Sequence, residues 1–147
     1  MNNEIYTLVG KIIEGVQTIE YLLVDGIKMA KILNVFNKYN EISENYYHKI
    51  EQDIKKLTDE MENMTFGNII YLIRIHEVLS NDDIEYLESI LSKRNQLVHK
   101  YFKHSDFELS DEIKQNYLQK FYNDINEFIN YLNNVIEEMK EDYERIK

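Results

Sequence analysis

The sequence predicts an all-α fold, an antiparallel up-and-down bundle of about five helices. The chain has no proline and only four glycines in 147 residues, so few positions oblige a helix to break. Apolar residues recur at spacings of three and four along most of the chain, which is the periodicity of amphipathic helices. No internal repeat or linker interrupts the pattern. We therefore expect a single domain over residues 1–147, long enough to bury one core.

The two longest helical patterns lie at the ends of the chain. The first runs from Ile5 to Phe36, and Gly15 and Gly26 are expected to loosen or kink it. The last follows Ser110, a residue type that caps helix N-termini. Its predicted inner stripe consists of Ile113, Tyr117, Leu118, Phe121, Ile125, Phe128, Ile129, Leu132, Ile136, Met139 and Tyr143.

Three shorter helices are predicted between them. One spans about Glu44–Glu62 and is weaker in apolar content. The next is capped by Thr65 and extends through Val78. It is apolar nearly all round, which predicts that it is deeply packed.

The remaining helix is predicted from about Asp82 to Phe102. Ser80 and Asp83 before and within its first turn have the spacing of a capping box. Residues 103–109 are the clearest predicted loop.

The composition excludes several classes of site. There is no cysteine, hence no disulfide, thiolate nucleophile or sulfur-ligated zinc. The histidines form neither an HExxH motif nor a Glu-x-x-His pairing, so no metal and no cofactor are expected. We expect His48 and His76 to be surface or packing residues, and nothing singles out His104 in the loop.

The apolar stretch over residues 5–36 carries several charges, which argues against a membrane span. The chain start lacks the basic region of a secretory signal. We therefore expect a soluble, cytoplasmic protein.

The charge is unevenly distributed. The net charge of −10 argues against broad affinity for nucleic acid. Between Ser89 and Ser105, however, there is no acidic residue, and the positive charges are Lys93, Arg94, Lys100 and Lys103. One basic patch on an acidic body favours a local anion site, although such a patch also arises by chance.

Arg94 lies where the helical pattern calls for an apolar residue. On a helical wheel, apolar side chains fall within about 60° on either side of it. A guanidinium stays charged and is costly to bury, so an arginine at this position is expected to lower the stability of the fold. The structural alternative is an arginine paired with a carboxylate from a neighbouring helix. The surrounding apolar residues are Leu87, Ile90, Leu91, Leu97, Val98 and Tyr101.

His99 and Asn95 share one flank of this helix, at about 140° and about 100° from Arg94. An arginine and a histidine suit proton transfer near a phosphate. The spacing of Arg94 and His99 alone is unspecific, but the full stretch RNQLVHKYF is more informative.

This stretch resembles the signature of the HEPN superfamily, and with Tyr101 it is most like the RX4HXY toxins of HEPN/MNT toxin–antitoxin pairs. Residues 65–70, TFGNII, also resemble a feature of HEPN-type sequences. The motif covers nine residues. It implies an HEPN-like helical domain that acts as a homodimeric, metal-independent endoribonuclease of a toxin or phage-defence type.

The residue types are compatible with that chemistry. RNA supplies the 2′-hydroxyl nucleophile, so the enzyme needs only proton transfer and charge stabilisation. His99 would transfer protons, Arg94 would hold the phosphate, and Asn95 would orient the phosphate or the imidazole. Lys93, Lys100 and Lys103 would add RNA backbone contacts.

The resemblance also implies a partner and a modification. The partner is a nucleotidyltransferase (MNT) antitoxin, and the modification is the addition of AMP to Tyr101. The alternative for Tyr101 is that it simply ends the apolar stripe with its hydroxyl in water.

Two other readings of the whole chain stay open. One is a non-catalytic HEPN-like dimer that binds a partner such as the antitoxin. The other is an unrelated helical interaction module in which Arg94 is structural. Because Arg94 and His99 flank rather than enclose a site, the catalytic reading favours a twofold dimer that completes a composite groove.

Overall fold

The computed structural model describes residues 3–39, 48, 51–53, 55–56, 59–60, 64–103 and 110–146, with side chains except at 35–39, 100–103 and 146. The helices are α1 (Asn3–Tyr39), α3 (Phe66–Ile75), α4 (Asn81–Lys103) and α5 (Asp111–Ile146). The described residues between positions 48 and 60 are helical as well, and the described part of the chain contains no strand. The predicted all-α helical bundle is confirmed.

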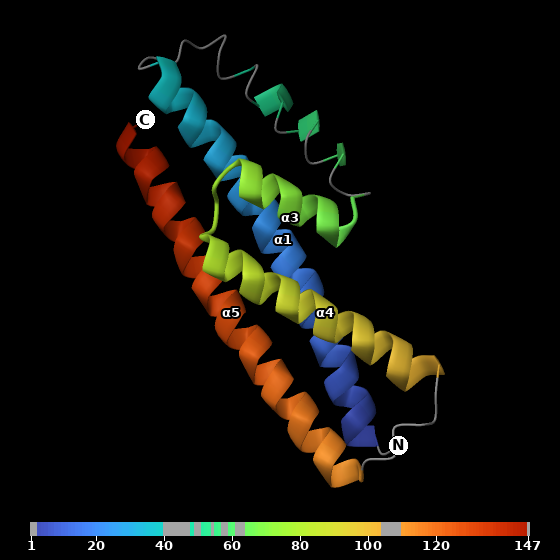
Figure 1. Ribbon diagram of the computed structural model, residues 1–147. Helices are drawn as coiled ribbons and strands as arrows, with labels where there is room; N and C mark the ends of the chain where they lie inside the picture. The colour runs from blue at the N-terminus through green and yellow to red at the C-terminus, as the bar shows by residue number, and fades with distance from the viewer. Residues whose placement is uncertain are drawn as a thin grey trace.

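Helices α1 and α5 run parallel, side by side along the length of the molecule, and α4 runs in the opposite direction (Figure 1). The side-chain amide of Gln115 donates to Glu4 at 2.7 Å, and farther along, α1 meets α5 at Gly15 and Ile125. This pairing of a helix at each end of the chain forms the most extensive helix contact among the described elements.

Gly15 and Gly26 do not end α1, which continues through both. Each is buried at a close approach of another element. A Cβ at Gly15 would lie 2.7 Å from Cγ2 of Ile125, and one at Gly26 would lie 3.0 Å from Cγ1 of Val78. Their role is therefore close packing rather than the predicted loosening of the helix.

The core consists of apolar side chains from α1, α3, α4 and α5. The fully buried positions on α1 recur at three- and four-residue spacing and face the other helices. The largest side chains below 2 % exposure are Ile5, Ile12, Ile19, Leu23, Ile27, Ile73, Ile84, Leu87, Leu118, Ile125, Leu132 and Val16.

Helix α3 is shorter and less deeply packed than its sequence predicts. It ends at Ile75 rather than continuing through Val78, and Glu77 has a φ of 52°. The amide of Val78 donates to the carbonyl of Ile73, and that of Glu77 to Arg74, which is a Schellman ending. Tyr71 and Ile75 are 62 % and 53 % exposed, so one face of α3 is not covered.

The predicted stripe of α5 is also wrong at its start. Ile113 and Tyr117 are 51 % and 47 % exposed, whereas Leu118 and Phe121 are buried. Helix α4 diverges from α5 toward this end of the molecule (Figure 1). Farther along α5, this flank contacts α4. At Ile113 and Tyr117, α4 no longer covers it.

Candidate functional site on α4

Helix α4 begins at a well-defined cap. The amide of Asp83 donates to the hydroxyl oxygen of Ser80 at 3.2 Å, as predicted. Asp82 and Asp83 place negative charge in the first turn, where it interacts favourably with the helix dipole. The carboxylate of Asp83, the other residue of the predicted capping box, accepts a hydrogen bond at Oδ2 from the hydroxyl of Tyr131 on α5 at 2.6 Å.

Arg94 lies in the apolar stripe that α4 directs into the bundle. Its neighbours Leu87, Ile90 and Leu97 are at most 4 % exposed. Arg94 itself is partly buried. Its Nε is fully buried and has no hydrogen-bond partner among the described residues. Burying a polar atom of a permanently charged group without a hydrogen-bond partner costs free energy of folding. The predicted loss of stability at Arg94 is therefore located at its Nε.

The charge of Arg94 acts on Glu20 of α1. Burial raises the pKa of Glu20, and the nearby guanidinium of Arg94 lowers this pKa in opposition. No ion pair within 4.0 Å joins Arg94 to a carboxylate in the described part of the chain. The structural alternative, an arginine paired with a carboxylate of a neighbouring helix, has Glu20 as its candidate partner, without a direct ion pair.

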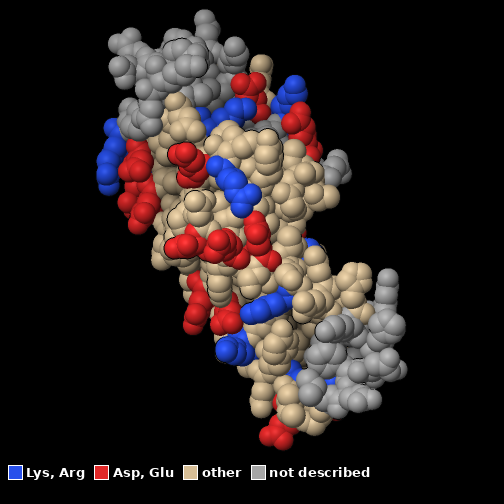
Figure 2. All heavy atoms as spheres, viewed as in Figure 1, with Lys and Arg blue, Asp and Glu red and all other residues tan. Residues whose placement is uncertain are grey.

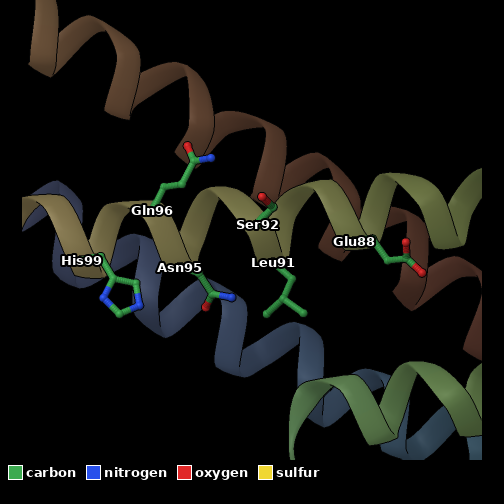
Figure 3. Close-up of a pocket in the computed structure, with 6 residues that line it drawn as sticks. All are labelled: Glu88, Leu91, Ser92, Asn95, Gln96 and His99. Atoms are coloured by element: carbon green, nitrogen blue, oxygen red, sulfur yellow. The ribbon is translucent and has the colours of Figure 1, made fainter.

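His99 and Asn95 are exposed and project from the same side of α4 (Figure 3). They line an open groove of about 400 Å³ on the outer surface of this helix. Gln96 projects from the opposite edge of α4 in the same view (Figure 3). The full lining is Glu88, Leu91, Ser92, Asn95, Gln96 and His99.

Within one protomer, the groove does not include Arg94. The structure thus brings together two of the three predicted catalytic residues, Asn95 and His99, in the groove lining, and the third is not part of that lining. This is the outcome of the 100° turn per residue, which sets Arg94 on an adjacent flank of α4.

The predicted RNA-contacting lysines have different outcomes. Nζ of Lys93 lies 5.7 Å from the ring centroid of Phe121 on α5, a cation–π contact that ties it to the bundle. For Lys100, Tyr101 and Lys103 the structure describes the backbone, which continues α4, and not the side chains. His104 lies outside the described residues.

Two further histidines lie away from the groove. His48 is exposed. His76 forms the C-cap of α3 and is partly buried. Burial lowers the pKa of His76, and the charge of Lys31 lowers it further. In the described residues no group of three or more acidic or histidine side chains is placed to hold a metal ion.

The described surface seen in Figure 2 carries no broad basic face. Acidic side chains lie along the body of the molecule, with scattered basic groups between them. At the groove itself, the carboxylate of Glu88 is paired with Arg74 of α3 at 3.1 Å. The positive charge of Arg74 offsets the negative charge of Glu88 at one end of the groove.

Sequence reasoning missed Glu20, Glu88, Ser92 and Gln96. The last three could have been found, because Glu88, Ser92, Asn95 and His99 follow one another at spacings of four, three and four on one helical face, and Gln96 lies four residues after Ser92. Glu20 could not, because its relation to Arg94 depends on how α1 crosses α4.

No described helix combines the length and the apolarity needed to cross a membrane. Comparison with known proteins gave no match to a protein family, to a curated protein or to a solved structure.

Proposed function

We propose that this chain is a metal-independent endoribonuclease whose active site is completed when two copies pack through α4. The observation that carries the proposal is the pairing on one helix of an exposed His99 with a partly buried Arg94 whose Nε lacks a partner among the described residues. A histidine transfers protons, and a guanidinium can bind a phosphate.

The groove geometry supports a second copy. Arg94 and His99 lie about 140° apart around α4, so one protomer presents them on different flanks. A twofold partner packed along the exposed stripe of α4 would supply a second copy of each residue to one composite site. The stripe from Glu88 to His99 has the three- and four-residue spacing with which helices pack.

In this site, His99 removes the proton of an RNA 2′-hydroxyl while Arg94 stabilises the negative charge that develops on the non-bridging phosphate oxygens. The 2′-oxygen forms a bond to phosphorus, the bond between phosphorus and the 5′-oxygen breaks, and the 5′-oxygen takes a proton from water, which gives a 2′,3′-cyclic phosphate and a free 5′-hydroxyl. The imidazolium of His99 then returns its proton to solvent. Asn95, beside His99, orients the imidazole or the phosphate. The charge pattern restricts contacts to a short RNA segment, since the body of the chain is acidic.

The test is cleavage of single-stranded RNA by purified protein in EDTA. His99→Ala and Arg94→Ala should each reduce cleavage at least about a hundredfold, as expected for loss of general acid–base catalysis or of charge stabilisation. Both variants should keep the helical circular dichroism spectrum. His48→Ala is the matched control, because His48 is exposed and lies outside the groove. Cleavage by either site variant within a few-fold of wild type would exclude the proposal.

Assembly gives a second test. Light scattering should show a dimer, and a charge introduced by Ser92→Glu in the groove should weaken it. A monomer at micromolar concentration would contradict the composite site.

A non-catalytic dimer that binds a partner, such as a nucleotidyltransferase antitoxin, is the second candidate. The observation in its favour is that Arg94 does not line the groove that contains His99. Under this candidate the dimer forms but RNA stays intact. In either case, addition of AMP to Tyr101 by the partner would place a phosphate near Arg94 and compete with an anionic ligand. Intact mass after co-expression with such a partner tests this modification.

A further inference from the structure

Three aromatic rings form one cluster where α4 begins alongside α5. Phe128 of α5 is buried, and its ring centroid lies 5.3 Å from that of Tyr86 on α4 and 6.1 Å from that of Tyr131 on α5. Tyr86 and Tyr131 remain 42 % and 43 % exposed. The cluster therefore presents two tyrosines to solvent over a buried aromatic base.

Both exposed rings are held in place by contacts within the bundle. Tyr131 stacks on Phe128, and its hydroxyl donates to Asp83 of α4 at 2.6 Å. Tyr86 meets the same Phe128 ring at an interplanar angle of 57°. Ordered side chains lose little conformational entropy when a partner binds, and tyrosines are enriched among the residues that dominate binding energy. These two rings therefore have the properties of an interaction surface.

Carboxylates surround the two tyrosines. On α5, Asp124, Glu127 and Glu138 lie seven residues before, four before and seven after Tyr131, which are spacings of one helical face. Burial raises the pKa of Tyr86, and the negative charges of Asp124 and Glu127 raise it further. Figure 2 shows acidic side chains gathered over the first half of α4 and the adjoining part of α5. We call this region the tyrosine–carboxylate surface, which consists of Asp83, Tyr86, Asp124, Glu127, Tyr131 and Glu138.

The carboxylates of this surface have no cationic partner among the described residues. The ion pairs within 4.0 Å in that part of the chain involve Glu88, Glu137 and Asp142 instead. The negative charge around the tyrosines is therefore not neutralised locally. A cation that lies on a tyrosine ring here would gain both a cation–π contact and Coulomb attraction to the carboxylates.

The tyrosine–carboxylate surface is separate from the groove that contains His99. Tyr86 precedes Asn95 by nine residues, which corresponds to about 180° around α4. The groove and the tyrosine–carboxylate surface thus lie on opposite sides of this helix. A partner bound at the tyrosines would leave the groove accessible.

We propose that the tyrosine–carboxylate surface binds an arginine-rich segment of another protein. A planar guanidinium can stack on a tyrosine ring while its N–H groups donate to a carboxylate, whereas a lysine ammonium is a compact charge that does not stack. Nucleic acid is disfavoured as the occupant, because the carboxylates would repel its phosphates. This role does not depend on whether the groove cleaves RNA.

The first experiment is calorimetric titration of the full-length protein with an oligoarginine peptide and an oligolysine peptide of equal length. The arginine peptide should bind at least about fivefold more tightly, because its guanidinium groups stack on the tyrosines. Tyr86→Leu should remove most of this preference. Tyr6→Leu is the matched control, since Tyr6 is 53 % exposed on α1, and it should leave the preference unchanged.

The second experiment separates local charge from the net charge of the chain. Asp124→Asn combined with Glu127→Gln should weaken binding of the arginine peptide at least about tenfold. Glu14→Gln combined with Glu141→Gln removes the same charge from exposed positions elsewhere and should weaken binding less than about twofold. Equal effects of the two double variants would show that the peptide is attracted only by the net charge of −10, and would overturn the proposal.

Two further outcomes would also overturn it. One is an unchanged preference for arginine in a folded Tyr86→Leu variant. The other is a wild-type dimer that Tyr86→Leu converts to a monomer in light scattering, because the occupant would then be a second copy of the chain. Should Tyr86→Leu lose its helical circular dichroism spectrum, NMR of the wild type decides. The ring resonances of Tyr86 and Tyr131 should shift as arginine peptide is added, and binding without those shifts would reject the tyrosine–carboxylate surface as its site.

Discussion

The hydroxyl of Tyr131 on α5 donates a 2.6 Å hydrogen bond to Oδ2 of Asp83 in the first turn of α4. Asp83 is also the residue whose amide donates to the Ser80 cap. One residue therefore connects the start of α4 both to its own cap and to the neighbouring helix, and this connection fixes where the site-bearing helix begins.

Tyr131→Phe should lower the free energy of unfolding by about 1 kcal/mol, because it removes a hydrogen bond to a carboxylate on a partly exposed surface. Urea denaturation at pH 7 measures the change. Tyr21→Phe is the control, since Tyr21 is 79 % exposed, and it should change stability by less than about 0.5 kcal/mol.

The same hydrogen bond predicts a dependence on alkaline pH. The hydrogen bond to Asp83 raises the pKa of Tyr131, with burial and nearby carboxylates acting in the same direction. The contribution of the hydroxyl is therefore complete below the unfolded pKa of about 10 and is lost as the pH rises through the folded pKa. The stability difference between wild type and Tyr131→Phe should shrink over that range. A constant difference would show that the proton of the hydroxyl does not matter.

Two glycines of α1 form a matched pair. Gly15→Ala should destabilise the protein by about 1 to 3 kcal/mol, because its Cβ would overlap Ile125. Gly10 is exposed, and a Cβ added there would have no atom within 4 Å. Gly10→Ala should therefore stabilise the protein by about 0.5 to 1 kcal/mol through helix propensity. Thermal unfolding of both variants measures the contrast. Equal effects would contradict the close approach of α1 and α5.

Glu77 adopts a left-handed backbone conformation, with a φ of 52°. Glu77→Gly should stabilise the protein by about 0.5 to 1 kcal/mol, because glycine accepts this conformation without a Cβ clash. Glu77→Ala keeps the Cβ and should be nearly neutral. A destabilising glycine would mean that the Glu77 side chain contributes more than its backbone costs.

His76 predicts a dependence on acid pH. Because its folded pKa is lowered by burial and by Lys31, the unfolded chain binds this proton more readily. Its stabilising contribution is present above the unfolded pKa of about 6.5 and is lost as the pH falls through the folded pKa. His76→Gln should reduce the loss of stability between about pH 7 and pH 5, measured by urea denaturation at both pH values.

Local signals in the sequence predicted the helix starts well. Thr65, Ser80 and Ser110 each accept a hydrogen bond from an amide three residues later. These caps depend on residues close in sequence, so the chain encodes them directly. The fold class follows from periodicity in the same way.

Features that depend on the crossing of helices were not predictable. Ile113 and Tyr117 fit the apolar stripe of α5 but remain exposed where α4 turns away. Arg94 was correctly placed among buried residues, yet its relation to Glu20 requires the position of α1. Helical periodicity gives the face of a residue and not the identity of what that face meets.

The parallel pairing of α1 with α5 has a consequence for synthesis of the chain. The apolar stripe of α1 meets its principal described partner only after about 100 further residues have been translated, which takes on the order of 5 to 20 s at typical rates. During that interval the stripe is open to other hydrophobic surfaces. Contacts this distant in sequence also slow spontaneous refolding. Nascent chains that stop before residue 111 should therefore depend on chaperones for solubility.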